Sequence, residues 1–82
     1  MDVIAAHKYS IRHKSSLIHD ESCGCFHCLE IFSPKEIEAW INDGADYTAI
    51  CPHCGVDSII GESSGYPITT DFLGRMRSHW FL

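Results

Sequence analysis

Two short cysteine motifs decide how this chain folds, Cys25-Phe26-His27-Cys28 and Cys51-Pro52-His53-Cys54. Two residues separate the cysteines within each motif, and 22 residues separate one motif from the other. A two-residue gap lets a tight turn direct both sulfur atoms at one ion, and the doubled motif is typical of zinc sites. Four thiolates complete the tetrahedron that zinc prefers and leave no open position for water. The sequence therefore predicts one structural Zn²⁺ held by Cys25, Cys28, Cys51 and Cys54.

A further cysteine, Cys23, gives the first half of the chain three thiols. Because Cys25 and Cys28 have the spacing of a zinc knuckle, we interpret Cys23 as a spare thiol beside the site. Two rival interpretations of the motifs stay open. A redox dithiol expects one motif at a helix N-terminus within a βαβ pattern, which neither motif has. An iron–sulfur cluster is also held by four cysteines.

The six histidines raise the question of additional metal ligands. His27 and His53 occupy the variable positions inside the two motifs, where we expect exposed side chains. His7, His13 and His19 recur every six residues, which places them on no single face of a helix. A second metal site is therefore not expected.

The size of the chain favours stabilisation by a metal. Its 82 residues are predicted to form a single domain, 1–82, with an N-terminal segment over 1–20 and a zinc module over 21–82. A domain this small buries only about 60% of its unfolded surface, so it usually needs a metal, disulfides or a partner. No apolar run reaches the roughly 20 residues of a membrane span, and the N-terminus lacks a signal-peptide pattern. We therefore expect a cytoplasmic protein with reduced cysteines and no membrane partner.

Negative charge is concentrated in the middle of the chain. The formal net charge is −5, and residues 21–62 carry eight acidic residues against Lys35 alone, a balance of −7. Nucleic acid is not the expected partner, since its binding relies on Lys and Arg that neutralise phosphates. The acidity favours a basic protein partner, such as a toxin or an enzyme. An acidity that only keeps a small protein soluble is the alternative.

The functional expectation follows from these features. Catalysis finds no support, because the predicted metal site is closed and no phosphate-binding loop is present. We expect a non-enzymatic protein-binding module, with a toxin-neutralising protein of the immunity type as its concrete version. The candidate partner-binding residues are Tyr66, Glu36, Glu38, Asp43 and Asp46. The alternative is a nucleic-acid-binding zinc finger that uses Arg12, Lys14, Arg75 and Arg77 if both ends of the chain converge on one face.

The residues between the motifs predict a central helix over 34–43. Ser33-Pro34-Lys35-Glu36 has the form of a capping box with proline in the first turn. Ile37, Trp40 and Ile41 then have the spacing of a buried helical stripe, and Gly44 suits the position after the helix end.

Other elements are predicted around this helix. A short helix is expected within 9–20, with Ser10 as its cap. Residues 47–50 and 58–60 are predicted to form a β-hairpin around the second motif, followed by a loop over 61–67. Thr70 is expected to cap a C-terminal helix at about 71–81. Its apolar stripe consists of Phe72, Leu73, Met76, Trp80 and Phe81.

Several stretches of the chain together resemble a known family. They are Cys23-Gly24-Cys25-Phe26-His27-Cys28, Cys51-Pro52-His53-Cys54-Gly55-Val56-Asp57-Ser58, Gly65-Tyr66-Pro67-Ile68-Thr69 and Trp80-Phe81. Over roughly residues 9–81 the chain resembles small bacterial zinc-binding proteins that carry only the label "cytoplasmic protein". The resemblance implies a cytosolic, bacterial, zinc-binding module and implies no activity. The predicted fold is thus a small α+β domain, treble-clef or zinc-ribbon-like, with two zinc knuckles, a central helix and a C-terminal helix.

Overall fold

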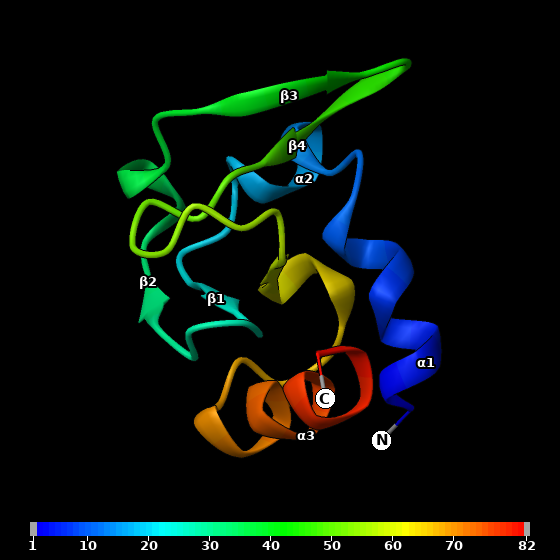
Figure 1. The fold of residues 1–82 in the computed structure, drawn as a ribbon. Helices are drawn as coiled ribbons and strands as arrows, with labels where there is room; N and C mark the ends of the chain where they lie inside the picture. Colours follow the sequence, from blue (N-terminus) through cyan, green and yellow to red (C-terminus); the bar gives the residue numbers. More distant parts are fainter. Residues whose placement is uncertain (1, 82) are drawn as a thin grey trace.

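The computed structural model describes residues 2–81 as a small α+β fold with two antiparallel sheets (Figure 1). The α-helices are α1 (Val3–Ala6), α2 (Lys14–Leu17) and α3 (Thr70–Trp80). The strands are β1 (Cys23–Cys25), β2 (Ile31–Phe32), β3 (Trp40–Asp43), β4 (Asp46–Ala49) and β5 (Ile59–Gly61). The 3₁₀ helices are η1 (His7–Ser10), η2 (Pro34–Glu36) and η3 (Glu62–Ser64). Within the described residues, no helix has the length and apolar character needed to cross a membrane.

The larger sheet carries the first cysteine motif at one end. β1 lies in its centre and pairs antiparallel with β2 on one side and with β5 on the other. Cys25 is the last residue of β1 and lies opposite Ile59 of β5. The backbone N–H of Phe26 extends this pairing by donating to the Ser58 carbonyl at 3.0 Å. The first motif therefore forms the turn that joins β1 to β2.

The predicted central helix over 34–43 is wrong. Only the single turn η2 forms, in which the Ser33 hydroxyl accepts a hydrogen bond from the Lys35 N–H at 3.3 Å. Ile37 already has an extended backbone, with φ −74° and ψ 121°. The Glu36 side chain approaches His53 instead of completing a capping box. The chain then continues as strand β3.

Gly44 begins a hairpin turn and does not end a helix. β3 pairs with β4 so that Asp43 lies opposite Asp46, which leaves Gly44 and Ala45 as the two turn residues. Of these two residues only Gly44 has a positive φ, 78°, as a type II′ turn requires at its first position. In the resulting strand Ile41 remains 43% exposed, and it does not share a buried helical stripe with Ile37.

The strands beside the second motif form close to the predicted positions but pair differently. β4 and β5 do not form a hairpin with each other, because β4 pairs with β3 and β5 pairs with β1. The second motif therefore joins the two sheets. In the larger sheet, Gly24 lets β1 lie close to α3, because a Cβ at this position would lie 2.6 Å from the Leu73 Cδ1.

The N-terminal segment is helical in separate pieces. α1 begins after Asp2, whose carboxylate accepts two backbone N–H bonds from the first turn. A short helix does lie within the predicted range 9–20, but it is the single turn α2 and begins only at Lys14, because Ile11 has an extended backbone and Arg12 has φ 46°. Ser10 caps no helix and lies buried at the end of η1.

The predicted C-terminal helix is present as α3. The cap is Thr69 and not Thr70, since the Thr69 hydroxyl accepts a hydrogen bond from the Phe72 N–H at 3.1 Å. Phe72, Leu73 and Met76 are buried as predicted.

The last turn of α3 differs from the predicted stripe. Trp80 and Phe81 remain 37% and 42% exposed. The Trp80 indole N–H donates to the Val3 carbonyl at 2.9 Å and so joins the end of α3 to α1. The two ends of the chain consequently lie side by side (Figure 1).

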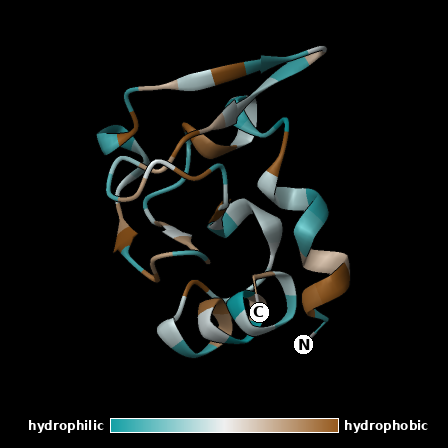
Figure 2. Ribbon diagram, in the orientation of Figure 1, coloured by the Kyte–Doolittle hydropathy of each residue, from teal (hydrophilic) through white to brown (hydrophobic). Residues whose placement is uncertain are grey.

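Two apolar clusters form the interior. One lies around the cysteine motifs and consists of Leu17, Cys23, Cys25, Phe32, Ile37, Ala49, Cys51 and Ile59. The other lies under α3 and consists of Ala6, Phe26, Ile60, Phe72, Leu73 and Met76. Apolar segments also occur on the outer two-stranded ribbon of β3 and β4 (Figure 2). Its turn end extends away from the rest of the fold (Figure 1), while Ala49 at its base belongs to the first cluster.

Candidate metal centre

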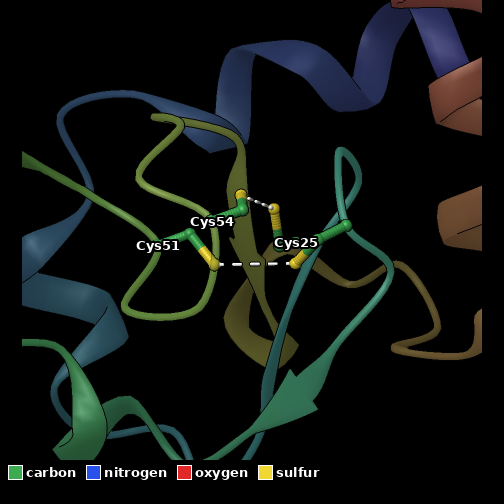
Figure 3. Close-up of side chains that lie close together, drawn as sticks. Cys25, Cys51 and Cys54 are labelled. Atoms are coloured by element: carbon green, nitrogen blue, oxygen red, sulfur yellow. Dashed lines mark hydrogen bonds between the residues drawn. The ribbon is translucent and has the colours of Figure 1, made fainter.

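The four predicted ligand cysteines come together at the junction of the two sheets. The sulfur atoms of Cys25, Cys28, Cys51 and Cys54 all lie within 4.8 Å of one another. Each close contact joins one motif to the other, at 3.6 Å between Cys25 and Cys54 and 3.7 Å between Cys28 and Cys51. Figure 3 shows the labelled cysteines pointing toward a common centre. The four cysteines could therefore hold a metal ion.

The spacing of the sulfur atoms fits a tetrahedral ion. A Zn–S distance of about 2.3 Å places two sulfur atoms of a tetrahedron about 3.8 Å apart. The two sulfur–sulfur contacts of 3.6 and 3.7 Å lie close to this value. All four cysteines are free of disulfides, so each can supply a thiolate. The donor set is complete for a tetrahedral ion and leaves no position for an additional ligand.

The two knuckles have the same backbone geometry. In the first, the Leu29 N–H donates to the Cys25 carbonyl at 2.8 Å, and in the second the Gly55 N–H donates to the Cys51 carbonyl at 2.9 Å. Leu29 and Gly55 both have a positive φ, 67° and 80°. This conformation turns the chain back immediately after the second cysteine of each motif. Leucine therefore adopts in one knuckle a conformation that glycine adopts at no steric cost in the other.

Backbone N–H groups inside the turns point at the sulfur atoms. The His27 N–H donates to the Cys25 Sγ at 3.3 Å, and the His53 N–H donates to the Cys51 Sγ at 3.4 Å. Such donors stabilise a thiolate because they bring partial positive charge to the sulfur. His27 and His53 thus contribute to the site through their backbone N–H groups.

Cys25 has the most favourable surroundings for a thiolate. Burial opposes its ionisation, but hydrogen bonds from the Ser58 hydroxyl and from backbone N–H groups outweigh burial and lower the pKa of Cys25. The Ser58 Oγ lies 3.1 Å from the Cys25 Sγ, and Ser58 is itself buried. Ser58 was not among the predicted site residues, because its contact with Cys25 depends on the pairing of β5 with β1.

The thiols of Cys28 and Cys54 keep their protons more firmly than the Cys25 thiol does. Burial, together with the neighbouring thiolate of Cys25, raises the pKa of Cys28 to about 11. Burial also raises the pKa of Cys54. Four negative charges in one small volume repel one another, so only a bound cation makes full ionisation favourable. Binding of a metal must therefore release protons.

Cys23 lies outside the metal-binding group. Its Sγ donates to the Phe32 carbonyl across the β1–β2 pair at 3.4 Å. Burial raises the pKa of Cys23 to about 12, so this thiol stays protonated. The group of cysteines that could hold an ion is Cys25, Cys28, Cys51 and Cys54 alone among the described residues.

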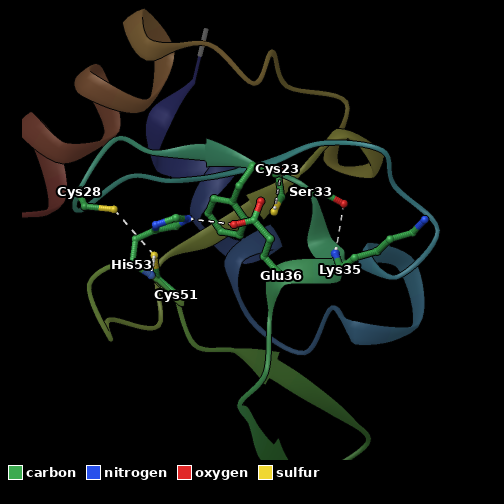
Figure 4. A network of polar contacts seen from close by, with 8 residues as sticks. Cys23, Cys28, Ser33, Lys35, Glu36, Cys51 and His53 are labelled. Atoms are coloured by element: carbon green, nitrogen blue, oxygen red, sulfur yellow. Dashed lines mark hydrogen bonds and ion pairs between the residues drawn. The ribbon is translucent and has the colours of Figure 1, made fainter.

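The two histidines inside the motifs differ in exposure. His53 is exposed, as predicted, and its Nε2 lies 3.3 Å from the Glu36 Oε1 (Figure 4). His27 is only partly exposed, contrary to the prediction, because its ring packs edge-on against Phe81 with centroids 4.8 Å apart. Neither imidazole belongs to the metal-binding group.

The candidate partner-binding residues do not form one cluster. Asp43 and Asp46 lie opposite each other at the end of the ribbon, where they contact Arg12 and Ser15. Glu38 is exposed and precedes β3. Tyr66 lies elsewhere, with its ring stacked on Phe72 at 5.4 Å. Glu36, as described above, faces His53 beside the second motif.

The fold and the site define this chain as a small α+β protein with a four-cysteine group that could hold a metal ion. No protein-family model, no curated protein and no solved structure matches the chain. The resemblance to small bacterial zinc proteins therefore remains a prediction.

Proposed function

We propose that the chain is a zinc-stabilised protein-binding module without enzymatic activity. The observation that carries the zinc assignment is the group of four sulfur atoms within 4.8 Å of one another. Thiolates favour zinc or an iron–sulfur cluster over hard cations. A single tetrahedral ion requires sulfur atoms about 3.8 Å apart, which the close contacts of 3.6 and 3.7 Å approach.

The zinc is proposed to act as part of the core. Cys25 and Cys51 are buried and belong to the apolar cluster at the junction of the sheets. The ion would join the β1–β2 turn to the segment between β4 and β5, so it would hold the two sheets together. Within the choice of zinc folds we favour a zinc-ribbon type over a treble clef, because a strand and not a helix follows each motif.

The proposed partner is a basic protein. Four acidic side chains of the block 21–62 are exposed and have no polar side-chain partner in the described structure: Glu21, Glu30, Glu38 and Asp57. Glu30 and Asp57 lie within three residues of a ligand cysteine, one beside each knuckle. Bound zinc with four thiolates adds a further net charge of −2 at this end of the molecule. The specific partner that we propose is a basic toxin in the bacterial cytosol.

The arrangement of basic residues favours this proposal over nucleic-acid binding. Arg12 forms an ion pair with Asp43 at 3.8 Å. The Lys14 ammonium lies over the rings of Trp40 and Tyr47 at 5.0 and 5.1 Å. Figure 1 shows α2, which begins at Lys14, at the opposite end of the molecule from α3. The arginines of α3 therefore do not extend a single basic surface toward Lys14.

Elemental analysis of the purified protein tests the metal assignment. We expect one zinc per chain, no iron and no acid-labile sulfide. Loss of the metal to a chelator should coincide with loss of the folded state. Iron with sulfide, or a chain that stays folded without metal, would contradict the zinc assignment.

A charge-reversal experiment tests the partner. Immobilised zinc-loaded protein should capture a basic protein at low salt, and the doubly substituted Glu30→Lys, Asp57→Lys form should lose it. The control is Asp71→Lys with Thr70→Lys and Ser78→Lys, three exposed positions of α3, which changes the net charge equally but away from the four acidic side chains. Equal loss in both forms would indicate attraction by net charge alone. Salt-sensitive retardation of DNA or RNA in a gel shift would favour the alternative function.

A further inference from the structure

The outer β3–β4 ribbon has one closed edge and one open edge. In an antiparallel pair, residues alternate between hydrogen-bonding toward the partner strand and pointing their N–H and C=O groups away. The Ile50 N–H donates to the Ala39 carbonyl at 3.0 Å, which identifies 39/50 as a hydrogen-bonded pair. Because the pattern alternates, the backbone N–H and C=O groups of Ile41 and Asp43 also bond to β4. The corresponding groups of Trp40 and Asn42 point to the opposite side of β3, away from β4.

His13 closes the edge formed by β4. Its backbone N–H donates to the Tyr47 carbonyl at 2.9 Å. Its imidazole Nε2 accepts a hydrogen bond from the Ala49 N–H at 3.1 Å. A single residue thus bonds to two of the outward groups of β4, the Tyr47 carbonyl and the Ala49 N–H, as a neighbouring strand would.

The edge formed by β3 has no such cover. Among residues 2–81 no hydrogen bond reaches the outward backbone groups of Trp40 or Asn42. Between them lies Ile41, whose side chain is 43% exposed. Natural edge strands avoid pairing through short length, charged side chains, proline or a bulge. β3 is short and ends in the charged Asp43, but no charge, proline or bulge interrupts Trp40, Ile41 and Asn42.

We propose that β3 is a self-association edge, at which a second copy of this chain pairs antiparallel to form a four-stranded sheet. A two-fold axis at Ile41 places Trp40 opposite Asn42 of the second copy. Each such pair would then exchange both of its N–H···O=C bonds. The central pair would be the non-hydrogen-bonded one, in which opposite side chains approach most closely. Ile41 would therefore pack on Ile41 of the second copy.

The register of the strand also fits a second copy electrostatically. Asp43 lies two residues from Ile41, so the two-fold axis sets it opposite Ala39 of the second copy and not opposite another acid. Like charges directly across a sheet are thus avoided. The net charge of −5 on each chain still opposes association at long range, and added salt should screen this repulsion. Salt should therefore strengthen the self-pairing, whereas it would weaken the binding of a basic partner.

The contact is small, since β3 has only four residues. Interfaces well below about 1,200 Å² of buried surface are usually weak and transient. We therefore expect a dissociation constant on the order of 0.1–1 mM. Sedimentation of the zinc-loaded, reduced protein over a concentration series that spans this range should show a reversible monomer–dimer equilibrium.

Two substitutions test the geometry. Asn42→Pro removes an outward N–H and leaves the bonds to β4 intact, as proline is tolerated at a free edge. Ile41→Lys puts like charges at the central pair without changing the backbone. Each should weaken association by roughly tenfold or more, equivalent to about 1.4 kcal/mol. The conservative controls Asn42→Thr and Ile41→Val should retain the dimer.

Amide exchange then locates the contact. As protein concentration rises, the N–H groups of Trp40 and Asn42 should gain protection, and that of Ile41, already bonded to β4, should change less. A protein that stays monomeric throughout the concentration series would overturn the proposal and leave the edge free for an extended segment of another protein. Dimerisation that persists in both Asn42→Pro and Ile41→Lys would overturn it as well.

Discussion

The imidazole of His13 accepts a hydrogen bond from the backbone N–H of Ala49, although 36 residues separate the two in sequence. The other ring nitrogen, Nδ1, lies 2.8 Å from the Tyr9 carbonyl. Since a carbonyl can only accept, Nδ1 must carry the proton and Nε2 must be the acceptor. His13 therefore holds the N-terminal segment against β4 as a neutral side chain. The contact stabilises the strand that leads directly into the second cysteine motif.

This geometry predicts a pH-dependent stability. Burial of the ring lowers the pKa of His13 and outweighs the opposite effects of the Tyr9 carbonyl and of Asp46 and Asp20. The unfolded chain binds a proton at His13 near pH 6.5, whereas the folded chain binds it only at a lower pH. The stabilisation is thus fully present above about pH 6.5 and is lost as the pH falls toward the folded pKa. Urea denaturation of the zinc-loaded protein at several pH values should show this loss.

The matched variant is His13→Gln, whose amide can donate to Tyr9 and accept from Ala49 without titrating. Its stability should fall less steeply between pH 7 and 5 than that of the original chain. Zinc release at low pH affects both proteins equally and so cancels in the comparison. Identical slopes would show that His13 does not carry the effect. His13→Ala leaves the Ala49 N–H unpaired and should lower the free energy of unfolding by about 1–3 kcal/mol at neutral pH.

His13 also shows why part of the site could not be predicted from the sequence. The CxxC spacing is a local pattern, and it identified the four cysteines that come together without knowledge of the fold. The role of His13 depends on a contact with residues 47–49, and periodicity around residue 13 gives no sign of it. The same is true of Ser58, which reaches Cys25 only because β5 pairs with β1.

The mistaken central helix has a related cause. Ser33-Pro34-Lys35-Glu36 is equally suited to a single 3₁₀ turn, and Ile37, Trp40 and Ile41 have a spacing that also occurs by chance in strands. What decides the conformation is the hairpin turn at Gly44 and the pairing of β3 with β4, which involve residues beyond the predicted helix. The C-terminal helix was predictable, because its buried residues lie within a single continuous segment, although its cap lies one residue before the predicted one.

Removal of one proposed ligand should separate the structural role of the proposed zinc from the role of Cys23. Cys25→Ser should abolish stoichiometric zinc binding and cooperative unfolding, since metal binding and folding are linked. Cys23→Ser keeps a hydrogen-bond donor for the Phe32 carbonyl and should lower the free energy of unfolding by only about 1 kcal/mol. Zinc content and thermal unfolding followed by circular dichroism measure both effects. Loss of zinc from Cys23→Ser would reveal that Cys23 is a ligand.

The hydroxyl of Ser58 is predicted to strengthen metal binding without holding the metal. Ser58→Ala removes the donor 3.1 Å from the Cys25 Sγ. Loss of such an outer hydrogen bond typically lowers metal affinity by about 10–100-fold. Competition with a chromophoric chelator measures the affinity. Ser63→Ala, at an exposed hydroxyl bonded to Asp20, is the control and should leave affinity unchanged.

Two glycine-to-alanine substitutions should have effects of opposite sign. Gly55 follows the second motif with φ 80°, and a Cβ there would meet no atom within 4 Å, so the cost of Gly55→Ala comes from backbone strain alone. We expect Gly55→Ala to lower the free energy of unfolding by about 1–2 kcal/mol. Gly74 lies inside α3, where a Cβ is equally unobstructed. Gly74→Ala should therefore stabilise the protein by up to about 1 kcal/mol.

Urea denaturation of the zinc-loaded variants measures both changes under identical conditions. If Gly55→Ala were neutral, the second knuckle would not need the left-handed conformation that Gly55 and Leu29 share. Leu29 shows that a side chain is tolerated in this conformation, so Gly55→Ala should still fold and bind zinc. The expected result is a fully metallated protein with lower stability, which places the cost in the turn itself and not in the metal ligands.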